Sequence, residues 1–221
     1  MNIYCTLDTE TFGGASKPKG IYHLGGIIHN RKGEILGSFN YLIMEHYGEI
    51  KKDDYAKKNF HLYQQYVENG ITTAVTTEQQ AVEAVNDLFN YFNVNYVMAF
   101  NSGFDFTKTL CKQLLEGREF IDIWLMALQT ICQLKKYSKY CADNNFITNK
   151  QKAKTSAEVV YAYLTNNAEY IEEHTAFEDS KIELEIFLAC LKSHKKFTKN
   201  IHCFDYCTQN NAFYLFPKIC S

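Results

Sequence analysis

The chain opens with an apolar run, residues 3–7, that ends directly in the acidic motif Asp8-Thr9-Glu10. Such a run predicts a β-strand, in which residues two apart face the same way and lie roughly 6–7 Å apart. The carboxylates of Asp8 and Glu10 are therefore expected side by side at a strand end. Like charges at that spacing resist burial unless they share a cation, and carboxylate oxygens suit Mg²⁺ or Mn²⁺. A polar turn after an edge strand gives the same short motif, so further ligands must come from elsewhere in the chain.

Length and composition limit the classes of protein to consider. The 221 residues, 46% of them hydrophobic and 22% charged, are enough for one sizeable α/β domain or one domain with an appendage. The net charge of −2 excludes a general polyanion binder, although lysine clusters at 135–139, 150–154 and 192–199 leave room for local contacts to nucleic acid. No stretch has the roughly 18 consecutive apolar residues of a membrane span, so no membrane partner is expected.

The cellular context is read from composition. The eight cysteines stand among apolar neighbours, which is typical of a reduced intracellular protein. The many Lys, Asn and Tyr residues indicate an AT-rich genome such as that of a bacterium or bacteriophage. We therefore expect a cytoplasmic protein.

Strand and helix patterns alternate along the chain. Residues 21–29 and 34–44 flank a turn and predict an antiparallel hairpin. A helix is expected to begin at Thr76 or Thr77, and residues 94–100 predict a central parallel strand because they are apolar on both faces.

The strand over 94–100 ends in Asn101-Ser102-Gly103-Phe104-Asp105, and a helix follows. Asp105 thus lies where the C-terminal end of a strand meets a helix start, which is where open α/β sheets bind ligands. For Asp105 alone, complementation of the helix dipole is the ordinary alternative. Asp122, at the next such junction, is expected to cap its helix and to stay outside the site.

A third acidic motif, His174-Thr175-Ala176-Phe177-Glu178-Asp179, opens the last long helix. Asp179 shares a helical stripe with apolar residues at offsets of three, seven and eleven, so it is expected to face inward, where a carboxylate needs a partner or a metal. Glu183 flanks that stripe. His174 can face the same site only from the loop before the helix, where a histidine can act as a general base near neutral pH.

Phe12 follows the first motif and precedes a small-residue turn, residues 13–16, that lets backbone and ligand approach closely. Its ring could stack on a nucleic-acid base, because aromatic faces accept any base. It could equally cover the end of the sheet, and the residues alone leave both alternatives open.

Taken in order, the three motifs and the strand and helix pattern between them resemble the DEDDh 3′–5′ exonucleases over residues 3–191. This group contains proofreading exonuclease subunits, RNase T and oligoribonuclease. Relatives with a catalytic tyrosine place it four residues before the last Asp, where this chain has Thr175, so the histidine branch fits. The resemblance implies a ribonuclease H-like α/β fold, with a five-stranded mixed sheet, one strand antiparallel, flanked by helices. It implies an exonuclease domain over 1–191 and a C-terminal extension over 192–221 that packs on it.

The implied activity is metal-dependent 3′–5′ hydrolysis of phosphodiester bonds at the ends of single-stranded DNA, releasing nucleoside 5′-monophosphates, in DNA replication, proofreading or repair. Two divalent ions, Mg²⁺ or Mn²⁺, and a histidine base would carry it. A 3′–5′ exoribonuclease or oligonucleotide-degrading enzyme is the alternative within the family, and a binding module without catalysis is the alternative outside the enzymes. The residues carried over are Asp8, Glu10, Asp105 and Asp179 as metal ligands and His174 as the base. The substrate-binding candidates are Asn101 and the backbone of Thr9, which would hold the 3′-terminal nucleotide, and Phe12 from its position.

The chain departs from the family pattern in the long segment 45–75, in 135–154 and beyond Lys192. Such segments often set specificity, so the sequence does not separate DNA from RNA substrates. We expect 45–70 to form a loop with a short helix. In the tail, residues 211–216 resemble the short motif ending in Leu-Phe with which bacterial replication proteins bind the sliding clamp, without its usual Gln. A replication protein is therefore a hypothetical partner of the tail.

Overall fold

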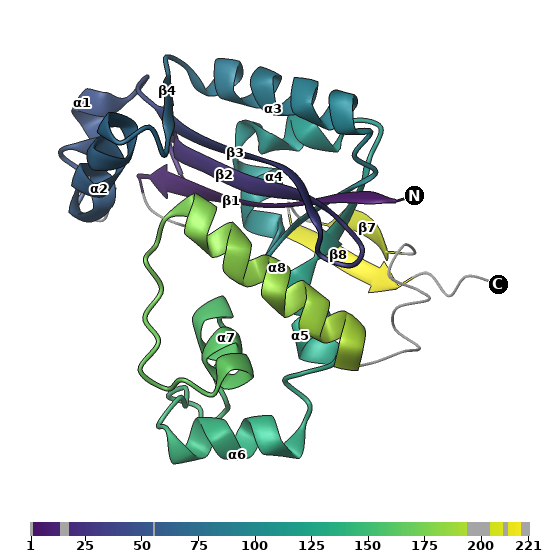
Figure 1. Cartoon of the computed structure of the whole chain (residues 1–221). Coiled ribbons are helices and arrows are strands. Elements are labelled where there is room, and N and C mark those ends of the chain that lie inside the picture. The colour runs from purple at the N-terminus through teal and green to yellow at the C-terminus, as the bar shows by residue number, and fades with distance from the viewer. Residues whose placement is uncertain (1, 14–17, 55, 194–203, 210–211, 218–221) are drawn as a thin grey trace.

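The computed structural model describes residues 2–13, 18–54, 56–193, 204–209 and 212–217. It shows three layers, a six-stranded sheet between two layers of helices (Figure 1). The strand order is β4-β3-β2-β1-β5-β6, and β2 is the one strand of this sheet that runs antiparallel to its neighbours. The strands are β1 (Ile3–Phe12), β2 (Gly20–Asn30), β3 (Ile35–Ile43), β4 (Thr73–Val75), β5 (Tyr96–Ala99) and β6 (Glu119–Asp122).

The α/β class, the mixed sheet and its single antiparallel strand are confirmed, but the expected count of five strands is one short. The additional strand is β4, which pairs in parallel with β3 at the edge of the sheet. It has three residues, too few to show the alternation by which a strand is read from sequence.

Helices cover both faces of the sheet (Figure 1). The helix α3 and the 3₁₀-helix η1 pack on one face, α8 crosses the other face, and α5 and α7 pack on α8. The predicted cap of α3 is confirmed, because the Thr77 hydroxyl accepts a hydrogen bond from the Gln80 backbone. The helices are α1 (Tyr47–Ile50), α2 (Ala56–Glu68), α3 (Glu78–Phe92), α4 (Gly103–Lys108), η1 (Leu110–Leu115), α5 (Ile123–Gln129), α6 (Lys135–Asp143), α7 (Ala157–Thr165) and α8 (Ala176–Ser193).

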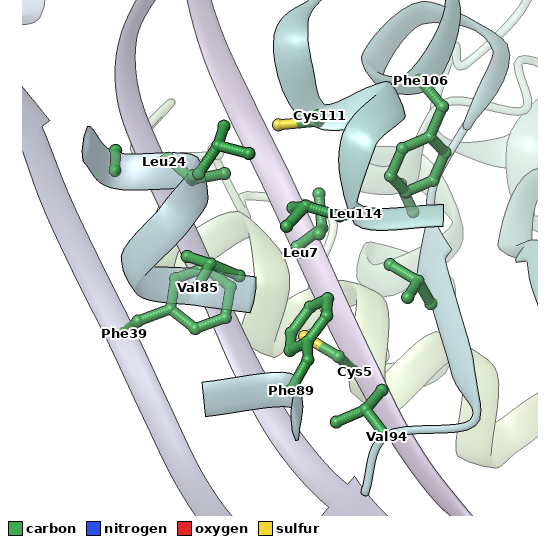
Figure 2. Close-up of a cluster of buried hydrophobic side chains, with 14 of the residues drawn as sticks. Cys5, Leu7, Leu24, Phe39, Val85, Phe89, Val94, Phe106, Cys111 and Leu114 are labelled. Atoms are coloured by element: carbon green, nitrogen blue, oxygen red, sulfur yellow. The ribbon is translucent and has the colours of Figure 1, made fainter. Parts of the chain in front are cut away.

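The alternation of side chains along β1 decides which face of the sheet carries the carboxylates of the acidic motif. Cys5 and Leu7 point into the hydrophobic cluster that the sheet forms with α3 and η1 (Figure 2). Tyr4 belongs to the other cluster, formed with α5, α7 and α8. Because side chains alternate along a strand, Asp8 and Glu10 lie on the α8 face of the sheet.

Beyond α8, the described part of the C-terminal extension is a separate antiparallel pair of strands, β7 (Phe204–Gln209) and β8 (Ala212–Pro217). Its strands lie near β6 and α4. In the tail motif, Asn211 lies outside the described residues and the other positions belong to β8. The division at residue 191 and the replication partner stay predictions. Within the described ranges, no helix has both the length and the apolar character to cross a membrane.

Candidate active site

Two strand residues and one helix residue bring their carboxylates together at one end of the sheet. Asp8, Glu10 and Asp179 each place one oxygen within 4.8 Å of the other two. Mg²⁺ binds oxygens at about 2.0–2.1 Å, so two opposed ligands of one ion lie roughly 4.2 Å apart, close to this spacing. The Oδ1 atom of Asp179 is buried and has no hydrogen-bond partner among the described residues. A set of oxygen donors that includes an unpaired buried oxygen fits a hard divalent cation.

The three carboxylates line a cavity of about 710 Å³. That volume falls within the range of small-molecule sites in proteins. The wall is acidic near β1 and α8 and aromatic near α4 and α5. The lining residues are Asp8, Thr9, Glu10, Thr11, Asp53, Phe100, Asn101, Phe104, Asp105, Trp124, Thr155, Ser156, Ala157, Glu172, Asp179 and Glu183.

Asp105 lines the same cavity from the first turn of α4 but lies outside the close group of three. Its Oδ1 atom accepts a 2.6 Å hydrogen bond from the Thr9 hydroxyl. This bond fixes the carboxylate against β1. Burial and the nearby Asp8 raise the pKa of Asp105, and the Thr9 bond lowers it in part. The structure thus places all four predicted metal ligands at one cavity, with three of them in a tight group.

The N-terminus of α8 is held on the sheet by two residues of β2. The backbone N–H of Ala176 donates to Nδ1 of His23, whose Nε2 is bonded to the Asn40 side chain. Burial lowers the pKa of His23 to about 4, so the ring stays neutral and can accept. A Cβ atom at Gly25 would lie 2.4 Å from the backbone nitrogen of the second residue of α8, so only glycine permits this approach. The hydrogen bond to His23 and the close approach at Gly25 together place Asp179, in the first turn of α8, over β1.

The crowded carboxylates perturb one another. Burial raises the pKa of Asp8 to about 7 and, with repulsion from Asp8, Glu172 and Glu10, that of Asp179 to about 10. The pKa of Glu10 is also raised, first by burial and then by Asp8 and Glu172. Ionising all of them together is costly unless a cation is present, which is the electrostatic condition of a metal site.

These raised pKa values predict a pH-dependent stability of the metal-free protein. The unfolded chain loses its carboxyl protons near pH 4, whereas the folded site keeps them to about pH 7 at Asp8 and about pH 10 at Asp179, so stability falls as pH rises through this window. The melting temperature in EDTA should drop by several degrees between pH 5 and pH 8, because one pKa unit is worth about 1.4 kcal/mol. Mn²⁺ should restore it at pH 8. A melting temperature in EDTA that stays constant or rises between pH 5 and pH 8 would contradict this prediction.

His174 lies in the loop before α8, the position required for it to share a site with Asp179. Its backbone is left-handed, with φ 53°. The side chain is 48% exposed, and Nδ1 lies 3.8 Å from Oε2 of Glu172. Glu172 lines the cavity, and His174 does not. The imidazole is therefore at the rim, beside the acid wall, and its part as a base stays a prediction.

The three substrate-binding candidates have different positions. Thr9 lines the cavity, and its hydroxyl is committed to Asp105. Asn101 lines the cavity with an exposed side chain and a left-handed backbone, φ 63°. Phe12 is 3% exposed, packs its ring on His46 and does not line the cavity. The burial of Phe12 favours the alternative in which its ring covers the end of the sheet, and the stacking role stays a prediction.

Among the cavity residues that were not sequence candidates, Glu172, Glu183 and Trp124 have side chains suited to chemistry or to base stacking. Glu172 lies in an irregular loop, where no periodicity marks a residue. Trp124 follows the carboxyl end of β6, so the rule that pointed to Asp105 at the end of β5 would have found it. The hydroxyl of Ser102 and the N–H of Leu125 both bond to Asp122, which confirms its expected capping role.

The comparisons with known proteins come from structure alone. Neither the protein-family models nor the curated proteins contain a match to this chain. Among solved structures, the crystal structure of a full-length 3′-exonuclease superposes with a TM-score of 0.62 at 14% identity, over 100% of this chain and 92% of the other. The fold is that of the 3′-exonucleases.

Two further structures agree. A 3′-exonuclease described by its specific recognition of the 3′ end of histone mRNA stem-loop gives a TM-score of 0.60 at 14% identity, again over 100% and 92% of the two chains. E. coli Exonuclease I in complex with a dA16 oligonucleotide gives 0.52 at 10% identity, over 90% of this chain and 42% of that one. At such identities the likeness establishes a shared fold.

Proposed function

We propose that this protein is a metal-dependent 3′–5′ exonuclease of the DEDDh type that shortens single-stranded DNA from its 3′ end and releases nucleoside 5′-monophosphates. One observation carries the proposal. Asp8 and Glu10 from β1 meet Asp179 from α8 at a cavity, with a buried oxygen of Asp179 left unpaired. The 3′-exonuclease fold supports it.

The residues of the site have separable tasks. Asp8, Glu10 and Asp179, with Asp105 opposite, would hold two divalent ions, Mg²⁺ or Mn²⁺. When bound, these ions supply a nucleophile at neutral pH and charge neutralisation at the phosphate. Thr9 keeps Asp105 in place through its hydroxyl. His174 takes the proton of the attacking water, and its Nδ1 atom lies 3.8 Å from Oε2 of Glu172 at the cavity wall.

The aromatic wall gives the cavity a surface for a base. Trp124, Phe100 and Phe104 all line it. The indole N–H of Trp124 donates a 3.1 Å hydrogen bond to the Thr155 hydroxyl, which holds the ring at the cavity. Aromatic side chains stack on any base without reading its identity, as an exonuclease that degrades every sequence requires. We assign Trp124 the stacking role that the sequence first suggested for Phe12.

A binding experiment tests this role directly, because Trp124 is the single tryptophan of the chain. Titration with a short single-stranded oligonucleotide in EDTA should quench its fluorescence. Trp124→Ala should weaken binding about 5- to 150-fold, the equivalent of 1–3 kcal/mol of stacking per base. Tyr91→Ala, which removes an exposed aromatic ring of α3, is the matched control and should bind as the wild type does. Unchanged emission at saturation would rule Trp124 out as the stacking residue.

RNA is the second candidate substrate. It is favoured by one of the solved structures that match over the whole chain, that of a 3′-exonuclease described by its recognition of histone mRNA stem-loop. Incubation with 5′-labelled DNA and RNA oligonucleotides in Mg²⁺, Mn²⁺ or EDTA separates the alternatives. We expect a ladder that shortens from the 3′ end of DNA, with none in EDTA. Shortening of RNA alone would name an exoribonuclease, and binding without shortening in Mn²⁺ would leave a nucleic-acid-binding module.

A further inference from the structure

Glu183 is a buried acid that the roles described so far do not use. It lies four residues after Asp179 on α8, and residues at this spacing are neighbours on a helix surface. The side chain is 3% exposed and lines the cavity. Glu183 therefore sits inside the site, one helical turn beyond an established member of the acidic group.

The carboxylate of Glu183 is held by one backbone hydrogen bond, and one of its oxygens has no partner among the described residues. The backbone N–H of Phe100, just after β5, hydrogen-bonds to it and favours its charged form. Its Oε2 atom is buried and has no hydrogen-bond partner within the described part of the chain. Native proteins pair nearly all such atoms, so an unpaired carboxylate oxygen facing a cavity indicates a ligand.

The surroundings of Glu183 are acidic. After burial, the groups that raise its pKa most are Asp8 and Asp105, followed by Asp179. Asp105 lines the cavity outside the close group of Asp8, Glu10 and Asp179, where its Oδ1 atom accepts the hydrogen bond from the Thr9 hydroxyl. The hydrogen bond from the Phe100 N–H holds Glu183 at the end of β5, the strand that leads to α4 and Asp105, and the charge of Asp105 acts on Glu183 from there.

We propose that Glu183 is a fifth carboxylate of the metal centre and that, with Asp8 and Asp105, it holds the second of two divalent ions. The first ion then belongs to Asp8, Glu10 and Asp179. The inference rests on the proposed function, because it assigns ligands within the same site. The opposing account makes Glu183 a protonated acid with a purely structural role.

Mn²⁺ binding measured by calorimetry without nucleic acid distinguishes the two accounts. Glu183→Gln keeps the shape and an acceptor for the Phe100 N–H but removes the charge. This variant should bind one Mn²⁺ equivalent in place of two. If calorimetry does not resolve the two binding events, it should bind Mn²⁺ about tenfold more weakly or worse. Glu185→Gln, which removes an exposed charge two residues along α8, is the matched control and should bind as the wild type does.

Thermal melts show whether the variant is folded. In EDTA, Glu183→Gln should melt at or above the wild-type temperature, because it removes a carboxylate from a repulsive cluster, while the stabilisation by Mn²⁺ shrinks. If this variant does not fold, Glu183→Asp keeps the charge but withdraws it, and it should also bind Mn²⁺ more weakly.

The outcomes separate this inference from the proposed function. If Glu183→Gln binds Mn²⁺ as the wild type does, Glu183 is not a metal ligand, and the account of a protonated acid with a structural role holds. If Glu183→Gln does not fold, the same result in Glu183→Asp leads to the same conclusion. A wild-type protein that binds no Mn²⁺ at millimolar concentration would instead defeat the proposed function itself.

Discussion

Replacing Asp179 with Asn should reduce hydrolysis about 10³-fold or more while leaving oligonucleotide binding close to that of the wild type. The carboxylate is one of three whose oxygens converge within 4.8 Å. Losing it removes several kcal/mol of charge stabilisation in the transition state, which corresponds to a rate loss of about 10³-fold. The substitution keeps the size of the side chain and removes one charge from a repulsive group. We therefore expect an inactive variant that is at least as stable as the wild type in EDTA.

Rates on a labelled oligonucleotide in Mn²⁺, together with melts in EDTA, check both parts of this prediction. Asp87→Asn, which removes an exposed carboxylate from α3, is the control and should cleave normally. Normal cleavage by Asp179→Asn would remove this residue from the site. A loss of activity accompanied by a large loss of stability in EDTA would instead mark it as structural.

Replacing His174 should lower the rate by about 10²–10⁴-fold, the share that a general base contributes. Asn is the suitable replacement, because it tolerates the left-handed backbone that His174 adopts, with φ 53°. Mn²⁺ affinity should not change, since the histidine is at the rim of the acidic group and not part of it.

Single-turnover rates at pH 7–8 and Mn²⁺ titrations measure the two effects separately. His61→Asn, in which an exposed histidine of α2 is replaced, controls for the general loss of an imidazole. A rate within about threefold of the wild type would assign proton removal to another group, and Glu172, whose pKa is raised to about 7 by burial and by Asp8, would be the first to test.

Periodicity was sufficient for the elements that carry the site. The apolar run before Asp8, the hairpin of β2 and β3, and the inward stripe of Asp179 all follow from residues whose spacing matches one buried face. Periodicity failed where burial is weak. The sequence predicts a loop with a short helix over 45–70, whereas the structure has α1 and the 13-residue helix α2 there, because α2 is too polar to show a buried face. In α6 the buried residues are Tyr137 and Cys141, which are too few to mark a helical face.

The convergence of distant acids could not be derived from spacing alone. It depends on long-range contacts such as the bond between the Ala176 backbone and His23, which no local pattern encodes. The place of Glu183 in the cavity could not be predicted for a related reason. Because α8 is covered by the sheet on one side and by α5 and α7 on the other, it buries more than the single stripe that an amphipathic reading expects.

The central claim is that acids from β1, α4 and α8 hold divalent cations in one cavity. Crystals of the metal-free protein soaked in Mn²⁺, with diffraction data collected at the manganese absorption edge, test it most directly. We expect an anomalous peak among Asp8, Glu10 and Asp179, with carboxylate oxygens at roughly 2.1–2.2 Å, and a second peak on the Asp105 side. An empty cavity in crystals that bind Mn²⁺ elsewhere, or an Asp179 carboxylate turned away from Asp8, would contradict it.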